Sequence, residues 1–380
     1  MISTSSTRMD RTRADDATVI PPEPAIPPRA VAVLGSGMMT GVGLSSPATC
    51  AAIRAGISGF AETRFMNSDG EWVIGCSVPL DPPWRGLAKL THLAAPAISE
   101  CLSFVANARP EDIPLLLCVA EKERPGRLVG LDDQLLPDLQ NLLGFRFHPR
   151  SAVIPRGRVG GAMAVNQARK LIHDQRLPYC IVVGVDSFLS GPTIGAYDAK
   201  HRLLTSANSN GFIPGEAGAA VLFGPPNSTA HSEFCCLAIG FGHENAIVES
   251  EEPLRGDGLT NAFRALHADG GMTIEDADYR YTDCNGEQYG FKNDRLAYAR
   301  TARKLKARFD HLHPADSIGE IGAAVVPCVL GLALTAARKG YAPGPGEGPE
   351  PGKVVLCHFS NDEGDRAALL LRYFQKGISR

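Results

Sequence analysis

Short apolar runs alternate with amphipathic helical patterns along most of the chain. Each run is short enough for a single strand and is bounded by turn-forming or helical segments. The runs that we expect to form strands lie at residues 30–35, 113–120, 179–186, 219–224, 235–242, 353–359 and 366–374. Alternating strands and helices predict a layered α/β architecture.

The segment 160–186 places a helical pattern directly before a strand. Four apolar residues lie at i, i+4, i+7 and i+8 and form one stripe of a helix over 160–174, namely Ala164, Ala168, Leu171 and Ile172. The following run, YCIVVGVD, is apolar on both alternating faces. We therefore expect a central strand that helices cover on both sides.

The chain divides into a tail and two halves of similar rhythm. Residues 1–28 are rich in Ser, Thr, Arg, Asp and Pro, and we expect a disordered tail there. Residues 29–226 and 227–380 each open with an apolar strand that ends in glycines and close with strand, turn and strand. This rhythm suggests a duplication. Within the second half, residues 341–353 are rich in Pro and Gly, and we expect an exposed loop there.

Charge and composition exclude several classes of function. The net charge is −3 with Lys and Arg scattered, so the chain has no basic surface for nucleic acid or an anionic membrane. No apolar run approaches the roughly 18 to 20 residues that span a bilayer. We expect a cytoplasmic protein whose ten cysteines are reduced and buried, without disulfides, a metal site or a cofactor.

The glycines of LGSGMMTGVG, residues 34–43, follow a strand and invite comparison with dinucleotide-binding loops. Gly35, Gly37 and Gly41 give the spacing G-x-G-x-x-x-G, which differs from the G-x-G-x-x-G of those loops. No acidic residue closes a second strand about 20 residues later. We expect a tight strand-to-loop turn and no bound nucleotide.

A second glycine-rich segment is more specific. NSNGFIPGEAGAAVLFGPP, residues 208–226, resembles the GF-x-x-GEGAG signature of β-ketoacyl synthases, which belong to the thiolase-like superfamily. The likeness extends to the opening at 29–60, to IVVGVDSF at 181–188 and to GEIGAA at 319–324. The resemblance implies a thiolase-like α/β fold, with two similar βαβαβ-type halves in a layered α-β-α-β-α core.

In that family the signature has a structural role at the floor of the site. The residues that the resemblance assigns to this role are Gly211, Phe212, Gly215, Glu216 and Gly218. The glycines would allow close passage of the backbone. A buried carboxylate at Glu216 needs hydrogen-bond donors, since an unpaired one costs several kcal/mol.

Ketosynthases use a cysteine thiolate at a helix N-terminus, assisted by two imidazoles. The resemblance puts the cysteine position at Val159 or Gly160, in PRGRVGG, and no cysteine lies between Cys118 and Cys180. It puts the first imidazole at Asp283 and the second at Glu320 or Gly319. The nucleophile and both imidazoles are therefore missing.

The replacements leave an enzymatic alternative open. Asp283, Glu287 and Glu320 could converge and perform acid–base chemistry. Cys284 could be a displaced nucleophile, although the neighbouring carboxylate raises the pKa of its thiol. His311 and His313 precede the turn, and we expect them to be solvated or to cap a helix.

The competing interpretation of DCNGE, residues 283–287, is a hydrogen-bonded turn. Asp and Asn side chains bond to nearby backbone, and Asn285 and Gly286 suit such a turn because glycine adopts positive φ. Together with the missing catalytic residues, this predicts a catalytically degenerate protein that binds or scaffolds. The alternative remains an acyltransferase of the 3-oxoacyl synthase type, or a hydrolase, with relocated residues.

Two groups of relatives suggest what such a protein binds. Chain-length-factor subunits resemble ketosynthases, lack the cysteine and pair with an active partner. Thiolase-like proteins encoded beside type VI secretion effectors are similar in having an aspartate and an NGE phrase at the histidine segment. We therefore expect a homodimer or a heterodimer with a paralogue, and as further partners an effector or adaptor protein or an acyl chain in the vestigial pocket.

Overall fold

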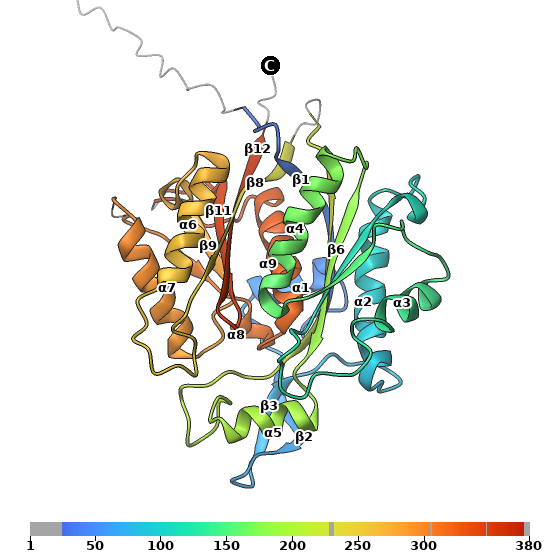
Figure 1. Cartoon of the computed structure of the whole chain (residues 1–380), viewed down its shortest axis with the longest axis vertical. Helices are drawn as coiled ribbons and strands as arrows, with labels where there is room; N and C mark the ends of the chain where they lie inside the picture. Colours follow the sequence, from blue (N-terminus) through green and yellow to red (C-terminus); the bar gives the residue numbers. More distant parts are fainter. Residues whose placement is uncertain (1–24, 228–231, 305, 347, 376–380) are drawn as a thin grey trace, which may run out of the picture.

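A computed structural model describes residues 25–227, 232–304, 306–346 and 348–375, so most of the expected tail lies outside the described residues. Its main element is a ten-stranded mixed sheet with the strand order β10-β9-β11-β12-β8-β1-β7-β6-β4-β5 (Figure 1). The strands of this sheet are β1 (Val31–Thr40), β4 (Leu115–Val119), β5 (Ala152–Pro155), β6 (Cys180–Ser187), β7 (Glu216–Gly224), β8 (Ser232–His243), β9 (Tyr279–Thr282), β10 (His311–Leu312), β11 (Val354–Ser360) and β12 (Asp365–Gln375). A separate two-stranded ribbon consists of β2 (Phe60–Met66) and β3 (Trp72–Cys76).

The ten strands form two sets of five with the same topology. In the first set β1 pairs antiparallel with β7, β7 antiparallel with β6, and β6, β4 and β5 run parallel. In the second set β8, β12, β11, β9 and β10 repeat these pairings in the same order and sense. The sets meet where Val31 and Ala32 of β1 pair with Cys236 and Cys235 of β8. The chain passes from one set to the other between β7 and β8, the connection that contains the expected boundary at 226/227.

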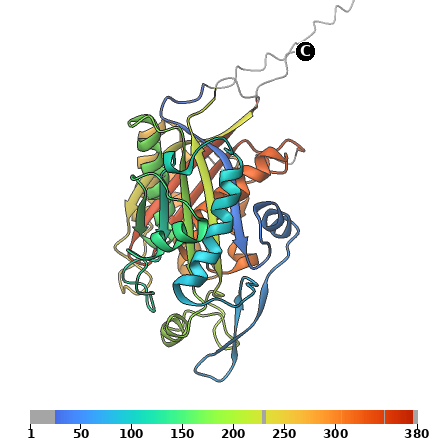
Figure 2. The same ribbon diagram turned by 90° about the vertical axis from the view of Figure 1, so that its right-hand side faces the viewer.

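The helices form the layers around these strands. They are α1 (Ser46–Arg54), α2 (Gly86–Ser103), α3 (Leu135–Leu143), α4 (Gly157–His173), α5 (Gly191–Ala199), α6 (Asp257–Gly270), α7 (Gln288–Thr301), α8 (Ala315–Ile318) and α9 (Val325–Arg338). α4 and α9 contact each other and strands of both sets, so they form the central layer (Figure 1). α2 packs on one outer face, where Figure 2 shows it across the strands, and α6 packs on the other. The result is the expected α-β-α-β-α order.

The glycine segment 34–43 forms the expected turn only at its end, where Thr40 and Gly43 exchange backbone hydrogen bonds. β1 continues through it to Thr40 and pairs with β7 along its length. A Cβ atom on Gly37 would lie 2.0 Å from the carbonyl oxygen of Ala97 in α2. The glycine is therefore needed for close helix-to-strand packing, which the sequence pattern does not distinguish from a turn.

The structure also gives the state of the cysteines, the start of α4, and the results of searches for membrane-spanning helices and metal-binding groups. All ten cysteines are free and buried. The helix expected from residue 160 begins at Gly157, three residues earlier. No helix among the described residues is long and apolar enough to cross a membrane. The same residues hold no group of three or more His, Cys, Asp or Glu side chains suited to a metal ion.

Candidate functional site

The N-terminus of α4 directs an arginine toward the positions expected for the imidazoles. The helix begins at Gly157, whose φ is +52°, and Arg158 is its second residue. Val159 is fully buried in the hydrophobic core, and Gly160 is buried beside Ile154 and Cys118 of β5 and β4. The side chain that faces Asp283 and Glu320 is thus Arg158, which directly precedes the expected cysteine position at Val159 or Gly160.

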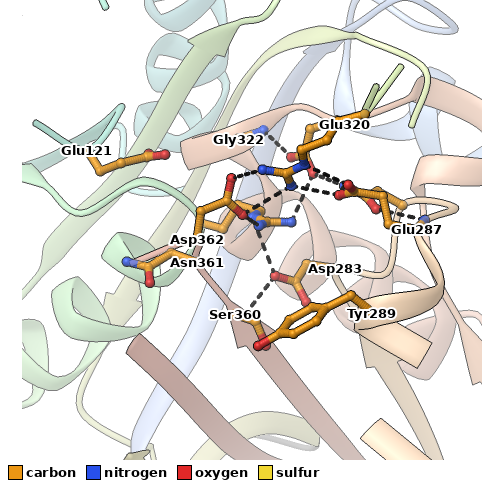
Figure 3. Close-up of polar contacts among 12 residues, drawn as sticks. Glu121, Asp283, Glu287, Tyr289, Glu320, Gly322, Ser360, Asn361 and Asp362 are labelled. Carbon is orange, nitrogen blue, oxygen red and sulfur yellow. Dashed lines mark hydrogen bonds and ion pairs between the residues drawn. The ribbon is translucent and has the colours of Figure 1, made fainter. Parts of the chain in front are cut away.

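Arg158 contacts three carboxylates (Figure 3). Its Nη1 lies 3.1 Å from Oε2 of Glu320, and its Nη2 lies 2.6 Å from Oδ1 of Asp362. Its Nε lies 3.9 Å from Oδ2 of Asp283. The side chain of Arg158 is only 14% exposed, so these contacts form in a largely dry environment.

A second arginine, Arg202, extends the network. It donates to both oxygens of Glu287 at 2.7 and 2.8 Å, and to both oxygens of Asp362 at 2.6 and 3.3 Å. Asp362 therefore bridges the two guanidinium groups (Figure 3). Sequence reasoning found neither Arg202 nor Asp362, since they lie in loops with no family phrase and are 160 residues apart.

The segment 283–287 forms the expected hydrogen-bonded turn. Gly286 has a φ of +113°, and Oδ1 of Asn285 accepts a hydrogen bond from the Glu287 amide at 3.3 Å. Nδ2 of Asn285 donates to Oε2 of Glu320 at 2.7 Å. Oδ2 of Asp283 accepts from the Ser360 amide at 2.7 Å. The turn thus connects to the arginine network and to the end of β11.

Glu320 has donors on both oxygens. Oε2 accepts from Arg158 and Asn285, and Oε1 accepts from the Gly322 amide at 2.8 Å. A carboxylate with this many donors is held in one orientation, and its hydrogen-bonding capacity is used within the protein. The structure therefore brings Asp283, Glu287 and Glu320 together, but around arginines.

The network shifts the acidity of two of its members in opposite directions. Burial raises the pKa of Asp283 above its usual value, and the charge of Arg158 only partly offsets this. Burial also opposes ionisation of Asp362, but Arg158 and Arg202 outweigh it and hold the pKa of Asp362 well below its usual value. Asp362 is therefore the permanent anion between the two guanidinium groups.

Cys284 is a poor candidate for a relocated nucleophile. Its side chain is 5% exposed, and its backbone amide donates to Oγ1 of Thr282 at 3.3 Å. Burial raises the pKa of its thiol, and the neighbouring Asp283 raises it further. Because the thiolate is the nucleophilic form, a buried thiol of raised pKa is inert at neutral pH.

The space left between these side chains is small. Arg158, Arg202, Asp283, Asn285 and Asp362 line a cavity of about 30 Å³. That volume holds about one water molecule. An acyl chain does not fit among the arginine network in this conformation.

A second buried ion-pair network lies beside the first, at the end of β6. Arg124 donates to Glu121 at 2.9 Å and to Oδ2 of Asp186 at 2.8 Å, and the same oxygen accepts from the Ala323 amide at 3.0 Å. The guanidinium carbon of Arg124 lies 3.9 Å from the ring centroid of Phe188. Asp186 lies in the expected strand-end phrase and is fully engaged in structural contacts.

The signature segment 211–218 has the contacts expected of structural residues. Glu216 is fully buried and accepts from the Val78 amide at 3.0 Å and from Ser187 Oγ at 2.7 Å. Nζ of Lys89 lies 2.5 Å from Oε2 of Glu216, the same oxygen that accepts from Ser187. A Cβ atom on Gly218 would lie 2.1 Å from the carbonyl oxygen of Leu93 in α2.

The remaining signature residues join this segment to the site. The Gly215 amide donates to the carbonyl oxygen of Glu320 at 2.9 Å. Phe212 is 1% exposed and packs edge-to-face on Tyr197 with a centroid distance of 5.1 Å. A Cβ atom on Gly211 would lie 2.4 Å from the carbonyl carbon of Leu203. These residues position the loop that contains Glu320.

The two histidines near the site are not solvated. The side chains of His311 and His313 are each 17% exposed and pack edge-to-face with a centroid distance of 5.2 Å. His311 Nε2 lies 2.7 Å from Oγ1 of Thr282. Burial lowers the pKa of His311 to about 3, so its ring is neutral, and the expectation of a solvated or capping role is wrong for it.

Among comparisons with known proteins, only solved structures match this chain. No protein-family model matches the sequence. No curated protein matches it either. Solved structures do match, and they are ketosynthases and complexes of ketosynthases.

The first is a type II polyketide ketosynthase in complex with its acyl-carrier protein, with 16% identity, a TM-score of 0.72 and coverage of 91% of this chain and 100% of that chain. The second is a ketosynthase with its chain length factor from Xenorhabdus doucetiae, with 13% identity, a TM-score of 0.71 and coverage of 90% and 98%. The third is a β-ketoacyl synthase from Burkholderia phymatum, with 14% identity, a TM-score of 0.68 and coverage of 91% and 99%. The likeness spans nearly the whole of each chain. The protein therefore has the thiolase-like fold of the ketosynthases.

Proposed function

We propose that this protein is a catalytically degenerate, ketosynthase-like protein that acts by binding another protein. The observation that supports this most directly is the environment of Arg158. In ketosynthases, which this chain resembles, a thiol lies between two imidazoles at this place. Here the guanidinium of Arg158 contacts Asp283, Glu320 and Asp362. An ion-pair network of this kind fixes the surrounding loops and presents no nucleophile to an acyl group.

The enzymatic alternative is an acyltransferase or hydrolase that uses Asp283, Cys284 or Glu320. Each of the three is engaged or inert: Asp283 and Glu320 accept backbone and arginine hydrogen bonds, and Cys284 is a buried thiol. The small cavity beside them gives a substrate no access. We therefore favour binding over chemistry.

We propose a second thiolase-like chain as the immediate partner, either another copy or a paralogue. Ketosynthase complexes with a chain length factor are among the similar structures. Proteins of the resembled fold pair through the edge of the first half's sheet, and here β5 ends that side with residues 152–155 partly exposed. Unpaired backbone groups on an edge strand are suited to pairing with another chain.

We propose further that the assembly is accessory to handling a type VI secretion effector. The support is the resemblance of Asp283 and the Asn285–Glu287 phrase to the corresponding segment of thiolase-like proteins encoded beside such effectors. This is an analogy of sequence and fold, and the partner would be an effector or adaptor protein. An acyl chain is the less favoured partner because the cavity is nearly filled.

A labelling experiment tests the central proposal. The full chain is incubated with radiolabelled acyl-CoA and acyl carrier protein, and intact-mass spectrometry looks for a covalent acyl adduct, with an active ketosynthase as positive control. We expect no adduct on the wild type or on Cys284→Ser. An adduct on the wild type that is lost in Cys284→Ser would establish the enzymatic alternative.

A second experiment tests the partner. Light scattering at micromolar concentration should give twice the 40.4 kDa mass of the chain, or a 1:1 complex after co-expression with a neighbouring thiolase-like gene. Co-purification with neighbouring gene products should recover a stoichiometric effector or adaptor. A monomer that recovers no partner under both conditions would contradict the scaffold proposal.

A further inference from the structure

A larger cavity lies apart from the arginine network, between α1, α9 and the loop that follows α9. Its volume is about 380 Å³, against about 30 Å³ at the network, and the two cavities share no lining residue. Ligand sites are generally concave, mostly apolar, and between about 300 and 1,000 Å³ in volume. The size of this cavity is therefore that of a small-molecule site.

Aromatic and aliphatic side chains form most of its wall. Tyr281 of β9 and Tyr341 after α9 line it, as do the rings of His311 and His313. Ile53, Leu332 and Ala336 supply aliphatic surface from α1 and α9. Planar rings in such a wall favour a planar aromatic ligand, because offset and edge-to-face ring contacts add to the burial of apolar area.

One lining cation has no carboxylate partner among the described residues. Arg54, the last residue of α1, lies with its guanidinium carbon 4.0 Å from the ring centroid of Tyr341 and is exposed. The stacking fixes the plane of the guanidinium and leaves its N–H donors available for a bidentate anion. Arg54 is thus positioned at the mouth of the cavity.

The other titratable groups of the wall do not replace this cation. His311 is neutral, since burial and the nearby charge of Arg280 hold its pKa at about 3. Asp316 is the lining carboxylate; it is 74% exposed and lies 2.9 Å from Nδ1 of His313. Its charge faces solvent and His313, so Arg54 is the unpaired fixed charge that a ligand meets.

We propose that this cavity binds a planar aromatic carboxylate, with the rings against Tyr281, Tyr341 and the histidines and the carboxylate on Arg54. A site of this kind would let a small metabolite bind to the scaffold. The proposal is independent of whether the arginine network is catalytic. It rests on the cavity, the ring wall and the unpaired guanidinium.

Calorimetric titration of the full chain with naphthalene-2-carboxylate tests the proposal. Naphthalene-2-carboxamide is the matched control ligand, since it has the same rings and no charge. We expect saturable binding of the acid, and weaker binding of the amide by about tenfold or more, which corresponds to the loss of one charged hydrogen-bonded contact. Absence of saturable binding of the acid at millimolar concentration overturns the proposal.

Two variants and a control test the contribution of the charge to ligand binding separately from that of the cavity. Arg54→Gln should weaken binding of the acid by about tenfold or more and leave the amide unchanged. Arg85→Gln, an exposed arginine outside the cavity, is the control and should change neither. Ala336→Leu fills the cavity and should weaken both ligands, with its unfolding midpoint measured to verify folding. Equal affinity of Arg54→Gln and wild type for the acid would refute the role of the guanidinium.

Discussion

The guanidinium of Arg158 lies 3.1 Å from the carboxylate of Glu320, where the resemblance expects a thiol to approach an imidazole. A thiol and an imidazole exchange a proton and so activate a nucleophile. A guanidinium and a carboxylate keep fixed charges at neutral pH, and their attraction holds two loops together. Under the proposed function, this place in the fold therefore stabilises structure and does not activate a nucleophile.

Replacing Arg158 by methionine should destabilise the protein strongly. The change leaves Asp283, Glu320 and Asp362 close together without the cation that they share. Breaking a buried ion pair by removing one partner costs about 3–5 kcal/mol, because an uncompensated buried charge remains. Urea unfolding at pH 7 measures the loss.

The matched control for that prediction is Arg109→Met. Arg109 pairs with Asp112 at 2.9 Å but is 75% exposed, and exposed pairs contribute about 0–1 kcal/mol. The double variant Arg158→Met with Glu320→Gln should recover part of the loss, since it removes one of the stranded charges. Equal destabilisation by Arg158→Met and Arg109→Met would show that the network does not stabilise the fold.

Asp362 and Asp283 should give opposite pH dependences of stability. The pKa of Asp362 is lowered in the folded state, so its contribution is complete above the unfolded pKa, about 3.9, and is lost as the pH falls through the folded value. Asp362→Asn should therefore destabilise at pH 7, by roughly 1–3 kcal/mol, and less at pH 3. Urea unfolding at the two pH values measures both effects.

For Asp283 the sign is reversed. Its pKa is raised in the folded state, so ionisation costs stability at pH 7 and wild-type stability gains from this group as the pH falls. Asp283→Asn keeps an oxygen acceptor for the Ser360 amide and should be neutral or stabilising at pH 7. A larger loss for Asp283→Asn than for Asp362→Asn at pH 7 would contradict the assigned directions.

Elements whose apolar residues recur with a helical or strand period were predictable from sequence. The strands at 179–186 and 219–224 and the helix that contains Leu171 were predicted because alternating or helical apolar patterns lie within one element. The turn predicted over 34–43 is confined to residues 40–43. Gly35 and Gly37 instead allow the close approach of Phe104 and Ala97, and α2, to which these residues belong or which they cap, is distant in sequence and produces no local pattern.

The candidate site was predictable only where a family phrase marks it. Asp283 and Glu320 were found from such phrases, and the structure brings them together around Arg158. Arg202 and Asp362 were missed because an ion pair across 160 residues leaves no periodic trace. Arg158 was missed because no family phrase marks it, although it directly precedes the expected position at Val159 or Gly160.

Gly218 should be intolerant of even a methyl group. A Cβ atom there would lie 2.1 Å from the carbonyl oxygen of Leu93, so β7 and α2 must separate. We expect Gly218→Ala to cost about 1–3 kcal/mol or more in urea unfolding, the range for overpacking a core. Gly191→Ala is the control, since nothing lies within 4 Å of its added Cβ, and it should change stability by less than about 0.5 kcal/mol. Similar stabilities of the two variants would contradict the close packing of β7 and α2.

The cysteines should be unreactive in the native protein. All ten are buried, and burial raises the pKa of the Cys284 and Cys118 thiols. Thiol reagents attack the thiolate, so both low access and a small thiolate fraction slow the reaction. Native protein should react with iodoacetamide at few or no sites within minutes, and urea-unfolded protein at all ten, as counted by intact mass.

A surface cysteine provides the control for this experiment. Ser68→Cys places a thiol on the exposed turn between β2 and β3, and it should be labelled rapidly in the native state. Peptide mapping then tests the site directly. Rapid native labelling of Cys284, at a rate comparable to that of the introduced cysteine, would mean that this thiol is accessible and ionised. That result would favour the enzymatic alternative over the binding function.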